Sequence, residues 1–307
     1  MTDKSIKPPI LVTGSHRSGS TWVGKVLASA KGTGYMHEPF NPIYPTPNRS
    51  PLKVWYHYVS QHNHDTYFQF FRDTLNWDYQ SGLRFAAINS AYKAKMWLKY
   101  SGIFLKNKGS RPIMKDPIAM FSAPWLHEQF NMPVVILVRH PAAFAYSLKR
   151  KDWGFPFEHL QRQKQLINDW LVDFESEIDE FTNSKKDIIE QACLVWRILY
   201  ATVSKFQEKY PQWIYLRHED LSLNPLEEFK GLFNKLDLEF DHNVEQYIIE
   251  SSGAENPAGT TGNEEQLQRN SAANIKYWRN KLSQEELDRI KELTQDIWPA
   301  FYCEADW

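Results

Sequence analysis

The chain has 307 residues, of which 42% are hydrophobic and 24% charged, and this length is enough to bury a large core. Its formal net charge is -1, so it has no general electrostatic attraction to nucleic acid, and any basic site must be local. Its two cysteines, Cys193 and Cys303, are too few for a disulfide framework.

The start of the chain predicts its location. The first nine residues lack the long apolar core of a signal peptide, and no apolar stretch approaches membrane-spanning length. We therefore expect a soluble, cytoplasmic protein without a membrane span. No linker, internal repeat or low-complexity tract divides the sequence, so we expect residues 1–307 to form a single domain.

The first predicted elements are a strand over residues 9–14 and a helix over residues 20–31. The turn between them gives the spacing G-x-x-x-x-G-S-T, one residue away from the P-loop pattern G-x-x-x-x-G-K-[ST]. Ser20 replaces the lysine, and Arg17 returns a positive charge three residues earlier. Backbone N–H groups and a helix N-terminus could still hold a phosphate here, but a triphosphate with magnesium fits poorly. The pattern favours a nucleotide with a 5′-phosphate ester; a plain turn and helix cap is the alternative.

Two carboxylates come next at the ends of strands. Glu38 lies in H-E-P-F, where a second strand would return near the phosphate loop. Asp116 lies in M-K-D-P, directly after a predicted strand over residues 111–115. Either could act as a base once partly desolvated. Asp116 could instead hold Lys115 or cap the next turn.

A second motif follows a run of apolar, mostly β-branched residues. Residues 133–139 read PVVILVR, which predicts a strand buried on both faces of a parallel sheet, and Pro141 opens a predicted helix over residues 141–151. Ligands bind outside the carboxyl ends of such strands. Arg139 lies at that end and Ser147 lies two turns into the helix, so together they could hold a second phosphate group. A solvated strand end is the alternative for Arg139.

The remaining elements continue an α/β pattern. One more parallel strand is predicted over residues 212–217, and further helices over residues 160–181, 187–209, 225–237, 242–251 and 283–297. We therefore expect a three-layer α/β/α fold with a central, mainly parallel sheet, similar to that of P-loop nucleotide triphosphatases.

Two segments stand apart from this regular pattern. Residues 41–110 form an aromatic-rich insertion that either builds part of a substrate pocket or packs into the core. Residues 251–273 are rich in Gly, Asn, Ser and Thr and predict a mobile loop.

Together, the two phosphate motifs resemble those of the sulfotransferases that use 3′-phosphoadenosine 5′-phosphosulfate (PAPS). The segment SHRSGSTW over residues 15–22 is similar to the family's loop for the 5′-phosphosulfate. Arg139, Pro141 and Ser147 match its R-x-P-x-x-x-x-x-S segment for the 3′-phosphate. RHEDL from Arg217 resembles the family's Y-E-D-L stretch, and KYWRN from Lys276 resembles its W-K-N segment. The loop arginine is more like the bacterial and carbohydrate-directed branches.

The resemblance implies transfer of a sulfuryl group from PAPS to a hydroxyl or amine. The reaction would run by in-line attack, need no metal and leave 3′-phosphoadenosine 5′-phosphate (PAP). Arg17 and the N–H groups of residues 18–21 would stabilise the leaving group. Relatives carry a glutamate in a similar E-P setting, which favours Glu38 as the base. Asp116 remains the rival, and Lys115 would either contact the sulfuryl oxygens or form a structural ion pair.

The expected nucleotide-binding residues come from four segments of the chain. Trp22 is placed to stack on adenine, His218 lies near the base or satisfies a backbone carbonyl, and Arg269 belongs to a loop that closes over the 3′-phosphate. The set comprises Ser15, His16, Arg17, Ser18, Gly19, Ser20, Thr21, Trp22, Arg139, Ser147, His218 and Arg269.

The acceptor is expected to be a glycan or a small-molecule metabolite, not a nucleic acid, and a bacterial source is favoured. Two other functions stay open. A nucleotide-dependent kinase is disfavoured by Ser20 at the lysine position and by the lack of an apolar strand ending in a magnesium-binding Asp. A catalytically silent nucleotide-binding protein would be favoured if Glu38 and Asp116 both lay far from the nucleotide.

Overall fold

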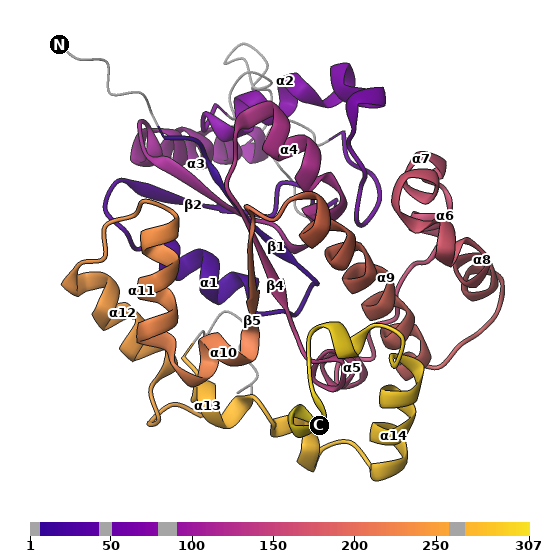
Figure 1. The fold of residues 1–307 in the computed structure, drawn as a ribbon. Coiled ribbons are helices and arrows are strands. Elements are labelled where there is room, and N and C mark those ends of the chain that lie inside the picture. Colours follow the sequence, from indigo (N-terminus) through magenta and orange to yellow (C-terminus); the bar gives the residue numbers. More distant parts are fainter. Residues whose placement is uncertain (1–6, 43–50, 79–90, 258–267) are drawn as a thin grey trace.

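Five parallel strands form the centre of the molecule in the computed structural model, which describes residues 7–42, 51–78, 91–257 and 268–307 (Figure 1). The strands follow the sheet order β2-β3-β1-β4-β5, and every neighbouring pair is parallel. Their bounds are β1 (Ile10–Gly14), β2 (Thr33–His37), β3 (Arg111–Lys115), β4 (Val134–Val138) and β5 (Ile214–Arg217). The four strands predicted from sequence are confirmed, and β2 is the expected return strand before Glu38.

Helices cover both faces of the sheet (Figure 1). One face packs against α1 (Ser20–Leu27), α11 (Pro225–Lys235) and α12 (His242–Ser252). The other packs against α4 (Ala123–Phe130), α5 (Pro141–Lys149) and α9 (Ile188–Lys209). The three-layer α/β/α fold is therefore confirmed.

The apolar run of β4 explains why this strand lies in the middle of the protein. Val134, Ile136 and Val138 face the core beneath α9, whereas Val135 and Leu137 face the core beneath α1. All five side chains are at most 2% exposed. A strand with both faces covered needs apolar residues at every position, as this sequence provides.

Capping signals fix three helix starts. Asp187 and Glu190 form a capping box at α9, and Ser283 and Glu286 form another at α14 (Gln284–Leu293). Pro225 stands at the first position of α11. The remaining α-helices of eight residues or more are α2 (His64–Leu75), α3 (Ala91–Asn107) and α8 (Glu175–Asn183); shorter ones include α10 (His218–Leu223) and α13 (Ser271–Asn274).

The single helix predicted over residues 160–181 is wrong. The structure has α6 (Glu158–Gln161), α7 (Lys164–Leu166), a π-helical turn, a 3₁₀ turn and then α8. At Gln163 the backbone leaves the helical region, with φ -97° and ψ 71°. The Gln163 side chain instead donates to Tyr56 O and accepts from Tyr58 N, so contacts to a distant segment interrupt the helix. Within the described ranges, no helix is long and apolar enough to cross a membrane.

Candidate active site

The carboxyl ends of all five strands meet at one edge of the sheet. Each strand is followed at once, or within three residues, by a residue that the sequence had singled out: Arg17, Glu38, Asp116, Arg139 and His218. A cleft of about 1130 Å³ opens at this edge. Eleven of the predicted site residues line it, whereas Ser15, Ser18, Lys115 and Asp116 do not.

The phosphate loop is a tight turn that depends on its glycines. At Gly14 (φ 146°), a Cβ atom would lie 2.5 Å from the carbonyl oxygen of Leu137. Gly19 has φ 90° and directly precedes α1, so the unpaired N–H groups of the first helical turn face the cleft beside Ser20 and Thr21. This arrangement suits an anion at the helix N-terminus.

Ser15 and Ser18 are fully buried and support this loop from behind. The Ser15 hydroxyl lies 2.9 Å from the Tyr200 hydroxyl, which also accepts a hydrogen bond from Arg139 N (3.1 Å). Tyr200, on α9, therefore joins the loop after β1 to the end of β4. The sequence placed Ser15 and Ser18 against the nucleotide; the structure places them beneath the loop.

Four arginines line the part of the cleft next to α5. Arg17 (φ 67°) donates from Nε to Ser147 Oγ at 3.0 Å, and Arg139 donates from Nη1 to Arg17 O at 2.6 Å. Arg150 and Arg269 line the same cleft. Burial, and then the positive charges of Arg139, Arg150 and Arg269, lower the pKa of Arg17 to about 10. So many mutually repelling cations favour a bound polyanion.

Three polar atoms near these arginines are buried without a partner in the described part of the chain: Ser18 Oγ, Arg139 Nε and His218 Nδ1. Buried polar groups nearly always have a partner in native proteins. Arg139 and His218 line the cleft, so their unmatched atoms indicate that something polar completes this wall, whereas Ser18 Oγ lies beneath the loop.

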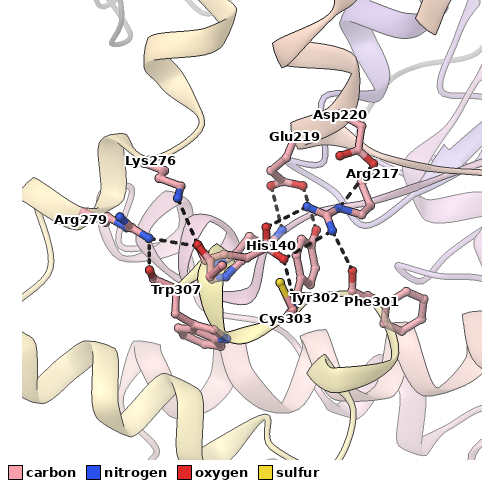
Figure 2. Close-up of polar contacts among 12 residues, drawn as sticks. His140, Arg217, Glu219, Asp220, Lys276, Arg279, Phe301, Tyr302, Cys303 and Trp307 are labelled. Atoms are coloured by element: carbon pink, nitrogen blue, oxygen red, sulfur yellow. Dashed lines mark hydrogen bonds and ion pairs between the residues drawn. The ribbon is translucent and has the colours of Figure 1, made fainter.

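Glu219 connects the residues that follow β4 and β5 (Figure 2). Its carboxylate accepts hydrogen bonds from His140 N (3.0 Å) and Tyr302 OH (2.9 Å). Arg217 pairs with Asp306 at 3.0 Å. The residues that flank Arg139 and His218 are thus held by side chains from the last elements of the chain.

Trp22 and His218 form one wall of the cleft. Trp22 packs edge-on against His218, and its indole N–H donates to Ser251 Oγ (2.9 Å). Trp22 is only 8% exposed, so most of its surface is buried in the core and only part of it lines the cleft. Arg269 N donates to Ser251 O at 3.0 Å, which brings Arg269 to the same wall. Of the loop predicted over residues 251–273, residues 258–267 lie outside the described residues.

Glu38 lies at the opposite side of the loop, held in an unusual backbone conformation (φ 42°). Its carboxylate forms an ion pair with Lys115 Nζ and accepts a hydrogen bond from Asn41 Nδ2 at 2.7 Å. Burial opposes its ionisation, but the Lys115 charge and these hydrogen bonds hold the pKa of Glu38 below its ordinary value. The Lys115 side chain is fully buried, and it fits because a Cβ at Gly24 would lie only 2.8 Å from Lys115 Cβ.

Asp116 is fully buried and does not reach the cleft. Its carboxylate accepts hydrogen bonds from Phe40 N (2.6 Å) and Ile118 N (3.2 Å), so it caps the turn after β3 and positions the segment after Glu38. Burial and the nearby Glu38 charge raise its pKa. The structure therefore gives Asp116 the capping role that the sequence left open, and leaves Glu38 as the carboxylate in the cleft.

Sequence reasoning missed Arg150 and Trp153, both in the cleft lining. Arg150 lies three residues after Ser147, so helical periodicity placed it on the same face of α5. Within the aromatic insertion, Trp55 lines the cleft, whereas Phe71 and Trp77 are buried in the core. Residues 43–50 and 79–90 of this insertion lie outside the described residues. Across the ranges that are described, no cluster of His, Cys, Asp or Glu could hold a metal ion.

Comparison with known proteins identifies similar chains. A family model described as "Sulfotransferase family" matches residues 8–242. The sulfotransferase domain of the curacin biosynthetic pathway is 17% identical with a TM-score of 0.50, over 95% of this chain and 99% of that one. The sulfotransferase domain of the Synechococcus PCC 7002 olefin synthase is 14% identical with a TM-score of 0.51, over 99% and 98%. At these identities, the structures show a shared fold. No curated protein sequence matches significantly.

Proposed function

The chain belongs to the sulfotransferase family, and on that premise we propose that it transfers a sulfuryl group from PAPS to a hydroxyl or amine, with Glu38 as the base. The observation that carries the proposal is the convergence of four arginines beside a helix N-terminus in one cleft. Such a site matches a nucleotide with two separate anionic groups.

The residues of the cleft divide between these two anionic groups. The helix N-terminus after Gly19, with Ser20 and Thr21, would hold the 5′-phosphosulfate. Arg139 and Ser147 would hold the 3′-phosphate, joined by Arg150 and by Arg269. The unpaired buried Arg139 Nε supports a ligand at this position.

The adenine would lie against the wall that Trp22 and His218 form. Burial, and then the charge of Arg139, hold the pKa of His218 well below its ordinary value, so its imidazole is neutral. A neutral imidazole beside an indole edge suits an uncharged heterocycle better than it suits a phosphate.

PAPS brings an activated sulfuryl group whose departure leaves the 5′-phosphate of PAP. Glu38 would take the proton of the acceptor on a carboxylate oxygen as the acceptor attacks. Arg17, the N–H groups at the start of α1 and the hydroxyls of Ser20 and Thr21 would stabilise the charge that develops on the leaving phosphate. The cleft thus separates a base on the β2 side from a cationic region on the α5 side.

Lys115 would act through Glu38. Its buried ammonium keeps the Glu38 carboxylate ionised where burial alone would favour the neutral acid. Of the two roles that the sequence left open for Lys115, the ion pair is favoured over direct contact with the sulfuryl oxygens, because Lys115 pairs with Glu38 and does not line the cleft. We propose that Lys115 orients the Glu38 carboxylate and keeps it ionised.

The cleft also bears on domain organisation. Its lining residues run from His16 to Trp278, so one site draws on nearly the whole sequence. This supports the proposal that residues 1–307 act as a single domain.

A radiochemical assay tests the proposed function. The protein would be incubated with [³⁵S]PAPS and a mixed panel of alcohols, phenols, sugars and amines, and the products separated by chromatography. We expect label in an organic product and stoichiometric PAP, and loss of both with Glu38→Gln. Appearance of PAP with inorganic sulfate alone, unchanged by Glu38→Gln, would contradict the assignment of this base.

A further inference from the structure

A ring of aromatic side chains surrounds His16 in the phosphate loop. Trp55 and Trp153 lie with their ring centroids 5.7 Å and 5.5 Å from the imidazole, and Phe144 lies 5.1 Å away. His16 is 5% exposed and lines the cleft together with the two tryptophans. Trp55 comes from the aromatic insertion and Trp153 from the turn after α5, so distant segments build this site.

Tyr56 fixes the hydrogen-bonding state of the imidazole. The Tyr56 hydroxyl accepts a hydrogen bond from His16 N (3.1 Å) and lies 2.9 Å from His16 Nδ1. The Tyr56 hydroxyl is fully buried, and among the described residues Nδ1 is the one acceptor within reach of its hydrogen. Because a buried hydroxyl hydrogen needs an acceptor, Nδ1 is assigned as the unprotonated nitrogen and Nε2 carries the hydrogen.

The imidazole also stays uncharged. Burial, and then the neighbouring Arg17 charge, lower the pKa of His16 to about 3. Nε2 is not among the buried atoms without a partner, and no partner is recorded for it in the described part of the chain. It is therefore the ring nitrogen that faces the cleft, as a neutral hydrogen-bond donor.

The indoles of Trp55 and Trp153 meet at 85° with centroids 5.4 Å apart, and both are partly exposed. Perpendicular indoles form an apolar corner that can take the flat face of a ring. Ala143 and Ile118 add further apolar surface to the lining. A polyhydroxylated ring would need a partner for each buried hydroxyl, and the faces of two indoles do not supply such partners.

We propose that His16, Trp55 and Trp153 form an acceptor subsite that takes a flat, largely apolar ring bearing a hydroxyl group. The His16 Nε2–H group donates a hydrogen bond to an oxygen of this acceptor. The inference rests on the proposed function, and it moves His16 from the nucleotide side, where the sequence placed it, to the acceptor side.

Calorimetry with 2-naphthol tests the subsite. PAP is titrated first, and 2-naphthol is then titrated into the PAP-saturated protein. His16→Phe keeps a ring but removes the hydrogen-bond donor. We expect it to lower the affinity for 2-naphthol about 2- to 12-fold, which corresponds to the loss of one neutral hydrogen bond. His16→Gln keeps an N–H group at a similar reach and should restore most of this affinity. PAP affinity should be unchanged in both variants.

Tryptophan variants supply a matched control. Trp153→Leu should lower the affinity for 2-naphthol. Trp170→Leu removes a similarly exposed indole that lies outside the cleft, so it should leave this affinity unchanged. Methyl β-D-glucopyranoside should bind the PAP complex more weakly than 2-naphthol. Tighter binding of this glucoside, or loss of PAP affinity in His16→Phe with 2-naphthol unaffected, would overturn the subsite and leave the proposed function intact. Failure of PAP to bind the wild-type protein would overturn the proposed function and the subsite together.

NMR spectroscopy of the wild-type protein tests the same proposal without any variant. With ¹⁵N-histidine labelling, the His16 ring should show the Nε2–H tautomer from pH 5 to pH 8, and 2-naphthol should shift its Nε2 resonance more than PAP does. An Nδ1–H tautomer, or titration near the ordinary histidine pKa, would overturn the proposal.

Discussion

Replacement of Gly19 by alanine, compared with a control glycine elsewhere, tests whether His218 packs against the nucleotide loop. Gly19 has φ 90°, a conformation that costs an L-residue roughly 1–2 kcal/mol. A Cβ at this position would also lie 2.5 Å from His218 Nδ1 and 2.8 Å from His218 Cε1. Ordinary contacts of a Cβ begin at 3.4 Å, so the buried His218 ring must move by roughly 1 Å or the loop must open.

Gly32 offers a matched control for the strain alone. It has φ 78°, and a Cβ there would meet no atom within 4 Å. Gly32→Ala should therefore lower the free energy of unfolding by about 1–2 kcal/mol, a fall in Tm of roughly 2–6 °C, without any change in the site.

The two variants should differ in ligand binding more than in stability. We expect Gly32→Ala to bind PAP as the wild type does. Gly19→Ala should bind PAP with an affinity lower by about 10-fold or more, because the helix N-terminus and the His218 wall both shift. Thermal unfolding and calorimetric titration with PAP measure the two quantities separately. Equal PAP affinity in Gly19→Ala and Gly32→Ala would refute the placement of His218 against the nucleotide loop.

Three further predictions concern charge in the cleft. Arg17→Ala should fold normally and lose about 10²–10³-fold in kcat, as removal of a leaving-group donor does; turnover within a few-fold of wild type would remove Arg17 from the mechanism. Glu38→Gln should bind PAP normally and lose about 10²–10⁴-fold in kcat, and the same behaviour in Asp116→Asn instead would make Asp116 the base. Activity of the wild type should fall as the pH drops through the Glu38 pKa, which lies below its ordinary value because Lys115 opposes the effect of burial. In Lys115→Met, no positive charge opposes the effect of burial, so the Glu38 pKa should rise and the fall in activity should begin at a higher pH. A pH–rate profile identical to that of the wild type would disprove the role of Lys115.

Local patterns predicted much of the fold. The apolar run of β4 and the glycine spacing after β1 each lie within about ten residues, and both elements form where the sequence indicates. The position of Arg139 and Ser147 in one cleft was also predictable, because the eight positions between them span a strand end and two helical turns. Such short-range signals depend little on the rest of the chain.

The finer parts of the site depend on contacts between distant segments. Glu38 and Lys115 are 77 positions apart, and only the pairing of β2 with β3 brings Lys115 into an ion pair with Glu38, which directly follows β2. The same pairing does not involve Asp116, which caps the next turn. The break at Gln163 arises from hydrogen bonds to residues more than 100 positions earlier. The subsite around His16 likewise needs Trp55 and Trp153 together. No periodicity within one segment carries this information.

The central claim is that the arginine-lined cleft recognises the 3′-phosphate of PAP. Calorimetric titration with PAP, AMP and ATP with magnesium tests it most directly. We predict tight binding of PAP without added metal, with AMP weaker by 10-fold or more because it cannot engage Arg139 and Ser147. Equal binding of AMP and PAP, or a preference for ATP with magnesium, would contradict the account.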